Sequence, residues 1–146
     1  MLRYTSAFQE KHRKFTGYIE KAICSRDEVK VIAISGAKVP LADMEDRPYP
    51  RIVQALLGVG PDLTKHSGAR VHNTYFLDRT YEDISAVLFC RHHIKNSAEV
   101  RGLEPGRDWV WVHNPLAKAP MPVGLLRVGQ AYSYSLKHED WRKPLP

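Results

Sequence analysis

The sequence is poor in the features that mark secreted and membrane proteins. Only two of its 146 residues are cysteines, and Cys24 and Cys90 lie far apart, so we expect two free thiols and not a disulfide framework. The longest apolar run, 84–90, is interrupted by Ser85 and is too short to span a bilayer. The first residues lack the apolar stretch of a secretory signal, and no N-x-S/T acceptor is present. We therefore expect a soluble, cytoplasmic protein without a transmembrane segment.

Motifs for nucleotide triphosphates and metals are incomplete. The glycines in 58–62 have neither the spacing nor the lysine of a phosphate-binding loop. Cys90, His92 and His93 are of the right types for zinc, but structural zinc needs four such ligands in paired spacings. The acidic cluster in 43–46 offers oxygen ligands for Mg²⁺ or Ca²⁺, although such a loop is more typical of a solvated turn. We expect no cofactor and no bound metal.

Positive charge is in excess. The chain has 22 Lys and Arg against 16 Asp and Glu, a formal net charge of +6, and its apolar content of 43% is typical of a globular domain. The excess favours polyanions such as RNA, DNA or an acidic membrane surface. Because the bases are spread thinly, with mild peaks at 11–14 and in 101–146, they indicate a general affinity for polyanions and not a dedicated binding arm.

A helix over about 7–24 is the clearest predicted element. Ser6 and Gln9 have the spacing of a capping box at its start. Apolar residues then recur at three- and four-residue steps and form one stripe. The stripe contains Phe8, His12, Phe15, Ile19, Ala22 and Ile23. The basic residues lie mostly outside it, so this helix presents a basic outer face.

Further elements follow from hydrophobic patterns and from the positions of proline and glycine. They are a strand buried on both faces at 29–34, a short helix at 51–57 between Pro50 and Gly58, a strand at 71–77, a helix from Thr80 to about 92 with a strand over 84–90 as the alternative, a strand at 109–113, a half-exposed strand at 130–136 and a Pro-containing tail at 137–146. Together they predict a single α+β domain over 1–146. In it, a mixed sheet of four to five strands packs with two to three helices in two layers.

Two of the seven histidines, His72 and His113, each follow a valine and precede an asparagine in a predicted strand. If those strands are neighbours, the imidazoles can act as general base and general acid in phosphodiester cleavage, with Thr74 on a phosphate oxygen. The His72-Asn73-Thr74 triplet is similar to half of the signature of two-histidine phosphoesterases. The second triplet ends in Pro115, which has neither a hydroxyl nor an amide donor. His72, Thr74 and His113 are the candidate catalytic residues.

Aromatic residues beside bases indicate a second kind of site. Rings stack on the bases of single-stranded nucleic acid while Lys and Arg contact its phosphates. Two tryptophans share one face of the strand at 109–113, and two tyrosines share a face of the strand at 130–136. The candidate nucleic-acid-binding residues are Lys11, Arg13, Lys14, Arg107, Trp109, Trp111, Arg127, Tyr132 and Tyr134.

Three functions are compatible with these features. The first is a small basic domain that binds nucleic acid or another polyanion through its aromatic strands and its first helix. The second is a viral or phage structural subunit that assembles into a homo-oligomer, for which the proline-rich C-terminal third and the basic surface are suited. The third is a metal-independent phosphodiesterase or ribonuclease using the two histidines. We rank binding and assembly ahead of catalysis, because neither needs a set of residues that the chain fails to complete.

Overall fold

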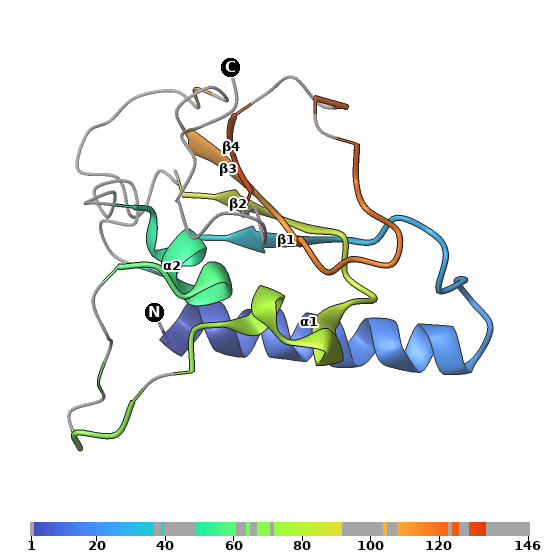
Figure 1. The fold of residues 1–146 in the computed structure, drawn as a ribbon, viewed down its shortest axis with the longest axis horizontal. Coiled ribbons are helices and arrows are strands. Elements are labelled where there is room, and N and C mark those ends of the chain that lie inside the picture. The colour runs from blue at the N-terminus through green and yellow to red at the C-terminus, as the bar shows by residue number, and fades with distance from the viewer. Residues whose placement is uncertain are drawn as a thin grey trace.

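Four strands form one mixed sheet in the computed structural model, and the helices lie on one side of it (Figure 1). The structure describes residues 2–36, 39, 49–60, 64, 67–70, 72–91, 104, 108–122, 124–125 and 129–133. Its elements are α1 (Leu2–Glu20), β1 (Val31–Ser35), α2 (Arg51–Leu57), the 3-10 turns η2 (Tyr75–Leu77) and η3 (Arg79–Tyr81), β2 (Ala86–Cys90), β3 (Trp109–His113) and β4 (Gln130–Tyr132). The predicted α+β class with a mixed sheet is confirmed.

The strand order in the sheet is β1-β2-β3-β4. β1 and β2 are parallel, β2 and β3 antiparallel, and β3 and β4 parallel. Parallel neighbours need a crossover connection, and α2 with the two 3-10 turns lies between β1 and β2 in the chain. Among the described strands, β1 therefore forms one edge of the sheet, and α1 packs beside it.

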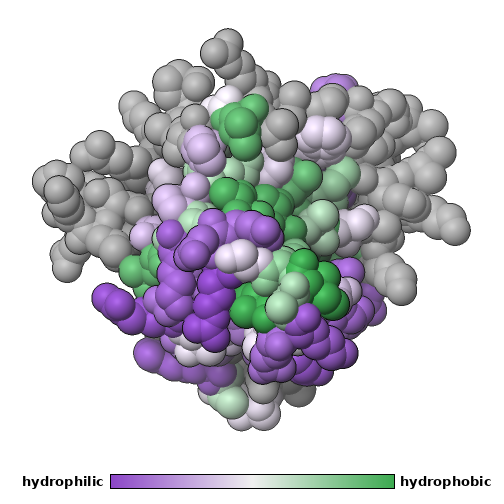
Figure 2. Space-filling view, turned by 90° about the vertical axis from the view of Figure 1, so that its right-hand side faces the viewer, coloured by the Kyte–Doolittle hydropathy of each residue, from purple (hydrophilic) through white to green (hydrophobic). Residues whose placement is uncertain are grey.

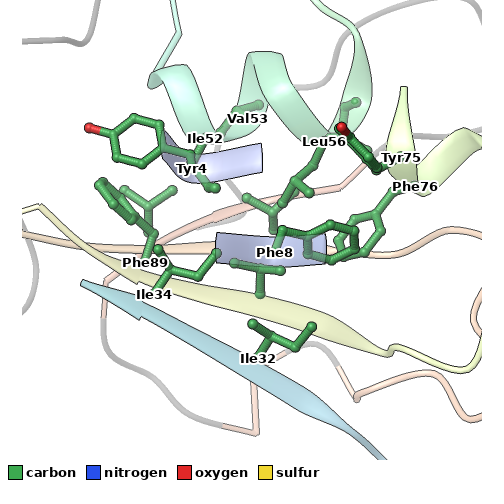
Figure 3. Packing of buried hydrophobic residues seen from close by; sticks show 14 of the residues in the cluster. Tyr4, Phe8, Ile32, Ile34, Ile52, Val53, Leu56, Tyr75, Phe76 and Phe89 are labelled. Atoms are coloured by element: carbon green, nitrogen blue, oxygen red, sulfur yellow. The ribbon is translucent and has the colours of Figure 1, made fainter. Parts of the chain in front are cut away.

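The main core fills the space between the sheet and the helices (Figure 3). Phe8 of α1 has no exposed surface, and its ring centroid lies 5.3 Å from that of Tyr75 and 5.6 Å from that of Phe76, in edge-to-face contacts. α2 contributes Ile52, Val53, Leu56 and Leu57 to the same cluster. Phe8 and Phe15 of the predicted stripe thus pack against this core, whereas Ala22 and Ile23, its last two members, lie beyond the end of α1 and are exposed.

The first helix is displaced toward the N-terminus relative to its predicted range of about 7–24. Ser6 lies inside α1 and is exposed, so the predicted capping box is wrong. The helix ends at Glu20 because Ala22 adopts a left-handed conformation with φ of 53°. The Ile23 amide then donates to the Tyr18 carbonyl (2.9 Å) and the Ala22 amide to the Ile19 carbonyl (3.0 Å). These two bonds are those of a Schellman motif, which usually uses glycine.

β1 buries one face and not two. Ile32 and Ile34 point into the core, whereas Ala33 and Ser35 are exposed. The predicted burial on both faces is wrong because β1 lies at the edge of the sheet, where its second face has little to cover it.

The segment 71–90 differs most from its predicted structure. No strand is present at 72–77, the described part of the predicted strand; Tyr75–Leu77 forms a 3-10 turn that packs Tyr75 and Phe76 against Phe8. The helix predicted from Thr80 is also wrong. Asp78 caps η3 by accepting a hydrogen bond from the Thr80 amide, and Ala86–Cys90 is a strand between β1 and β3. The alternative strand over 84–90 is the correct interpretation.

Other local predictions are confirmed. Pro50 precedes α2, and Gly58 ends it in a left-handed conformation with φ of 71°. Trp109–His113 forms β3. Gln130–Tyr132 forms β4 at the start of the predicted strand 130–136; Ser133 is not part of it, and 134–136 lie outside the described residues. Among the described residues, no helix has both the length and the apolar character that are needed to cross a bilayer.

Candidate functional site

The two histidines singled out by the sequence occupy different kinds of position. His113 ends β3 and is 8% exposed. His72 is exposed and lies before η2, where its ring packs edge-on against Tyr75 at 4.5 Å between centroids. Thr74 is half-buried, and its carbonyl accepts a hydrogen bond from the Leu77 amide. Because only His113 is in a strand, the neighbouring strands that the catalytic hypothesis required are not present.

Asn114, which follows His113, has a structural role. Its side-chain amide donates to the carbonyls of Tyr81 (2.9 Å) and Ile84 (2.8 Å), and its oxygen accepts from the Leu116 amide (2.9 Å). The residue is 4% exposed, so these bonds satisfy its own buried side-chain amide and oxygen. The Val-His-Asn setting at 112–114 is thus explained by packing at the end of β3.

Burial of His113 should make the stability of the protein pH-dependent. Burial lowers the pKa of its imidazole, so the unfolded chain takes up this proton more readily than the folded one. The contribution to stability is complete above the unfolded pKa of about 6.5 and is lost as the pH falls toward the lower folded pKa. We expect the free energy of unfolding, measured by urea titration, to fall between about pH 7 and pH 5. His113→Asn should flatten this slope, by at most about 1.4 kcal/mol per pH unit; parallel profiles would contradict the prediction.

The aromatic strands do not offer an open stacking surface at the positions that can be described. Trp111 is 3% exposed and packs with Ala86 and Met121 on the sheet face opposite the helices. Trp109 is half-buried. Tyr132 packs against the main core, and its hydroxyl donates to the Gln130 side chain at 3.3 Å. The remaining strand-associated candidates, Arg107, Arg127 and Tyr134, lie outside the described residues.

The basic residues predicted on the first helix are exposed, but they do not form one patch. Successive residues of an α-helix are about 100° apart, so Lys11 and Lys14 project to one flank of the buried stripe and Arg13 to the other. Each flank lies beside a different neighbour. Lys11 and Lys14 line a groove with β1, and Arg13 lines a pocket with Tyr81 at the end of η3.

The groove between α1 and β1 has a volume of about 260 Å³. Its α1 side carries two lysines and two aromatic rings, and its other side is the edge strand. The lining residues are Lys11, Lys14, Phe15, Tyr18, Val31, Ile32 and Ala33. Tyr18 is 44% exposed, and its ring centroid lies 6.1 Å from that of Phe15 in an edge-to-face contact. The groove therefore combines positive charge with an accessible ring.

Lys14 also contacts Glu10, with Nζ 2.9 Å from the carboxylate. Hydrogen bonding to Glu10 and its negative charge raise the pKa of the Lys14 ammonium, which therefore stays charged. Both side chains are more than half exposed, at 53% and 61%, so this pair contributes little to stability. Lys14 is therefore available to an anion that enters the groove.

Exposed apolar residues are present at this end of the molecule, and one of them, Tyr18, lines the groove. Tyr18, Ile23 and Val29 are exposed large hydrophobic residues of the end of α1 and of the connection to β1. Figure 2 looks at this end of the molecule and shows an apolar area surrounded by hydrophilic side chains. A surface of this kind suits a ligand with both flat apolar groups and charges.

The pocket on the opposite flank of α1 has a volume of about 340 Å³ and is lined by Gln9, His12, Arg13, Thr16 and Tyr81. The ring centroids of His12 and Tyr81 are 4.7 Å apart. Burial lowers the pKa of the His12 imidazole, while the charge of Asp83 and a hydrogen bond to the Thr80 backbone raise it. Burial raises the pKa of Tyr81, whose hydroxyl is also hydrogen-bonded to the Gln9 side chain. The pocket lining includes no carboxylate.

Known proteins give no direct guide to this site. Comparison of the chain with protein families, curated proteins and solved structures found no match. Within the described residues, no group of three or more His, Cys, Asp or Glu side chains is placed to hold a metal ion, and neither Cys24 nor Cys90 is in a disulfide. His92, His93 and the acidic cluster at 43–46 lie outside those residues. The candidate sites in the described residues are the groove and the pocket on the two flanks of α1.

Sequence patterns could have indicated part of this arrangement. Tyr18 lies seven residues after Lys11 and four after Lys14, so helical periodicity already places all three on one side of α1. Tyr81 and the β1 residues come from distant parts of the chain, and only the tertiary structure brings them to α1.

Proposed function

We propose that the groove between α1 and β1 binds single-stranded nucleic acid. The observation that supports the proposal is the combination, in one groove, of Lys11 and Lys14 with the exposed ring of Tyr18. Lysine ammonium groups neutralise phosphates without reading sequence, and an accessible ring stacks on any base. The net charge of +6 favours the approach of any polyanion to the whole molecule. The ring adds a preference for polyanions that carry bases.

The edge position of β1 leaves room for an extended ligand. Residues 31–33 of β1 form the second wall of the groove. A single strand can follow this wall with its phosphates toward the lysines. In this proposal α1 contacts nucleic acid, as the sequence predicts. The ring that stacks on a base is that of Tyr18 and not that of the buried Trp111.

Fluorescence anisotropy with labelled oligonucleotides at two salt concentrations tests the proposal. We expect single-stranded RNA or DNA to bind and its affinity to fall as salt rises. In the double variant Lys11→Gln/Lys14→Gln, the slope of log K against log salt should become shallower by up to about 1.4, because each lysine–phosphate contact on a single strand contributes about 0.7. Tyr18→Ala should weaken binding by about 5- to 150-fold with little change in salt slope, since stacking is worth about 1–3 kcal/mol.

Lys21→Gln is the matched control, because Lys21 is an exposed lysine near the end of the helix that does not line the groove. It should reduce binding only slightly. Dextran sulfate, a polyanion without bases, separates the two kinds of contact: wild type and Tyr18→Ala should bind it equally. The proposal is overturned if no oligonucleotide binds even at low salt, or if the groove variants bind like Lys21→Gln.

A further inference from the structure

The pocket lined by His12, Arg13 and Tyr81 has the donor chemistry of an anion site. The Arg13 guanidinium is a permanent cation with several N–H donors, and the Gln9 side chain supplies an amide. The Thr16 hydroxyl donates to the His12 carbonyl at 3.2 Å, which ties it to the helix backbone. Cationic and polar groups thus converge on a pocket whose lining has no acidic side chain to repel an anion.

His12 is oriented by its neighbours on the facing segment. Its hydrogen bond to the Thr80 backbone favours the protonated ring, so the imidazole donates and the carbonyl of Thr80 accepts. A neutral imidazole has only one N–H, and this bond uses it. The second ring nitrogen is then an acceptor when the ring is neutral, and it becomes a donor when the ring takes up a proton.

The negative charge of Asp83 acts on His12 and favours its protonated form. Its Oδ1 atom is buried, accepts no hydrogen bond within the described structure, and lies 3.6 Å from the Nζ of Lys118. It does not line the pocket, yet its charge favours the protonated form of His12. The charged or titratable neighbours of His12 in the described residues include Arg13 on its own helix and Tyr81 and Asp83 on the facing segment. Lys118 lies beside Asp83, and its Nζ atom is also 2.6 Å from the carboxylate of Glu82.

We infer that this pocket binds a tetrahedral oxyanion, a free phosphate or the phosphate of a phosphomonoester, and that His12 takes up a proton from solvent when the anion binds. Arg13 supplies the permanent charge, the Gln9 amide a neutral donor and protonated His12 a second cation. The inference goes beyond the proposed function, because the pocket and the nucleic-acid groove lie on opposite flanks of α1.

Calorimetric titration with sulfate at pH 5.5 and pH 7.5 tests this inference, because sulfate keeps its double charge over this range. We expect tighter binding at pH 5.5, by at most about tenfold per pH unit for one proton. At pH 7.5 the measured heat should depend on the ionisation heat of the buffer, since the proton comes from solvent. Arg13→Gln should weaken binding at both pH values by about tenfold or more.

His12→Gln separates the proton-linked role from a structural one: we expect weak, pH-independent sulfate binding. If this variant does not fold, the imidazole resonances of wild-type His12 give the same information, because sulfate should raise its titration midpoint. Lys21→Gln is the control, because this exposed lysine lines neither the pocket nor the groove, and it should bind sulfate like the wild type. The inference is overturned if Arg13→Gln binds like the wild type, if sulfate leaves the His12 midpoint unchanged, or if no sulfate binds at pH 5.5.

A second titration at pH 7.5 distinguishes the sources of the oxyanion. Inorganic phosphate, adenosine monophosphate and adenosine are compared under the same conditions. Equal affinity for the first two indicates a site for the free ion, and tighter binding of the nucleotide indicates a phosphomonoester. Adenosine alone should not bind; binding of adenosine and the nucleotide with equal affinity would overturn the inference. Lys11→Gln/Lys14→Gln changes only the groove, and Arg13→Gln changes only the pocket. Oligonucleotide binding and sulfate binding therefore test the two proposals separately.

Discussion

Phe8→Ala is expected to lower the free energy of unfolding by about 3–5 kcal/mol. Phe8 has no exposed surface, and its ring contacts those of Tyr75 and Tyr81, each at 5.3 Å between centroids, in addition to Phe76. Figure 3 shows the Phe8 ring beside Tyr75 and Phe76. Alanine at this position would leave a cavity among closely packed aromatic side chains. Urea or guanidinium unfolding followed by tryptophan fluorescence and circular dichroism measures the loss.

Leu125→Ala is the control for this prediction. Leu125 is 62% exposed, so its truncation should change the free energy of unfolding by no more than about 0.5 kcal/mol. Similar losses in the two variants would mean that Phe8 is not at the centre of the core. Because Phe8 also supports Tyr81, the Phe8 variant should lose sulfate binding in the pocket as well.

Gly129→Ala should be the second strongly destabilising substitution, with a loss of about 2–5 kcal/mol. Gly129 precedes β4 and has a φ of 86°, a conformation that costs an alanine about 1–2 kcal/mol. In addition, a Cβ atom at this position would lie 2.6 Å from the carbonyl oxygen of Trp109. That oxygen belongs to the backbone of β3, so relief of the contact requires β4 to shift along its partner strand.

Gly124→Ala separates the two contributions to this loss. Gly124 has a similar φ of 81°, but a Cβ atom there would meet no described atom within 4 Å. We expect it to cost only the conformational penalty of about 1–2 kcal/mol. Thermal and urea unfolding of the two variants side by side provide the measurement; a Gly129 variant no less stable than the Gly124 variant would show that β4 is not held closely against β3.

The two flanks of α1 give the helix two different chemical environments. On the β1 side, lysines and an exposed tyrosine suit a flat, charged polymer. On the η3 side, a guanidinium and a half-buried imidazole suit a compact anion. Sequence patterns placed Lys11, Arg13 and Lys14 in one basic face, because they are near neighbours in the chain. Helical geometry and the separate neighbours of each flank divide them.

Local signals were sufficient for some elements and insufficient for others. Proline and glycine bracket α2 with the conformations that these residues prefer, so its limits were predictable. The end of α1 was not, because its left-handed position is occupied by Ala22, which gives no sequence signal. Segment 84–90 fits both a helical and an extended pattern, and pairing with β1 and β3 decided between them.

The α+β class, the amphipathic character of the first helix, the basic charge and the strand at 109–113 could all be predicted from the amino-acid sequence. These properties depend on composition and on periodicities of a few residues, which act locally. Three features are evident only from the tertiary structure: 86–90 is a strand, Trp111 is buried, and Arg13 and His12 share a pocket with Tyr81. Such outcomes depend on hydrogen bonds and packing between segments that are distant in the chain, and no local pattern records which distant partner a residue will meet.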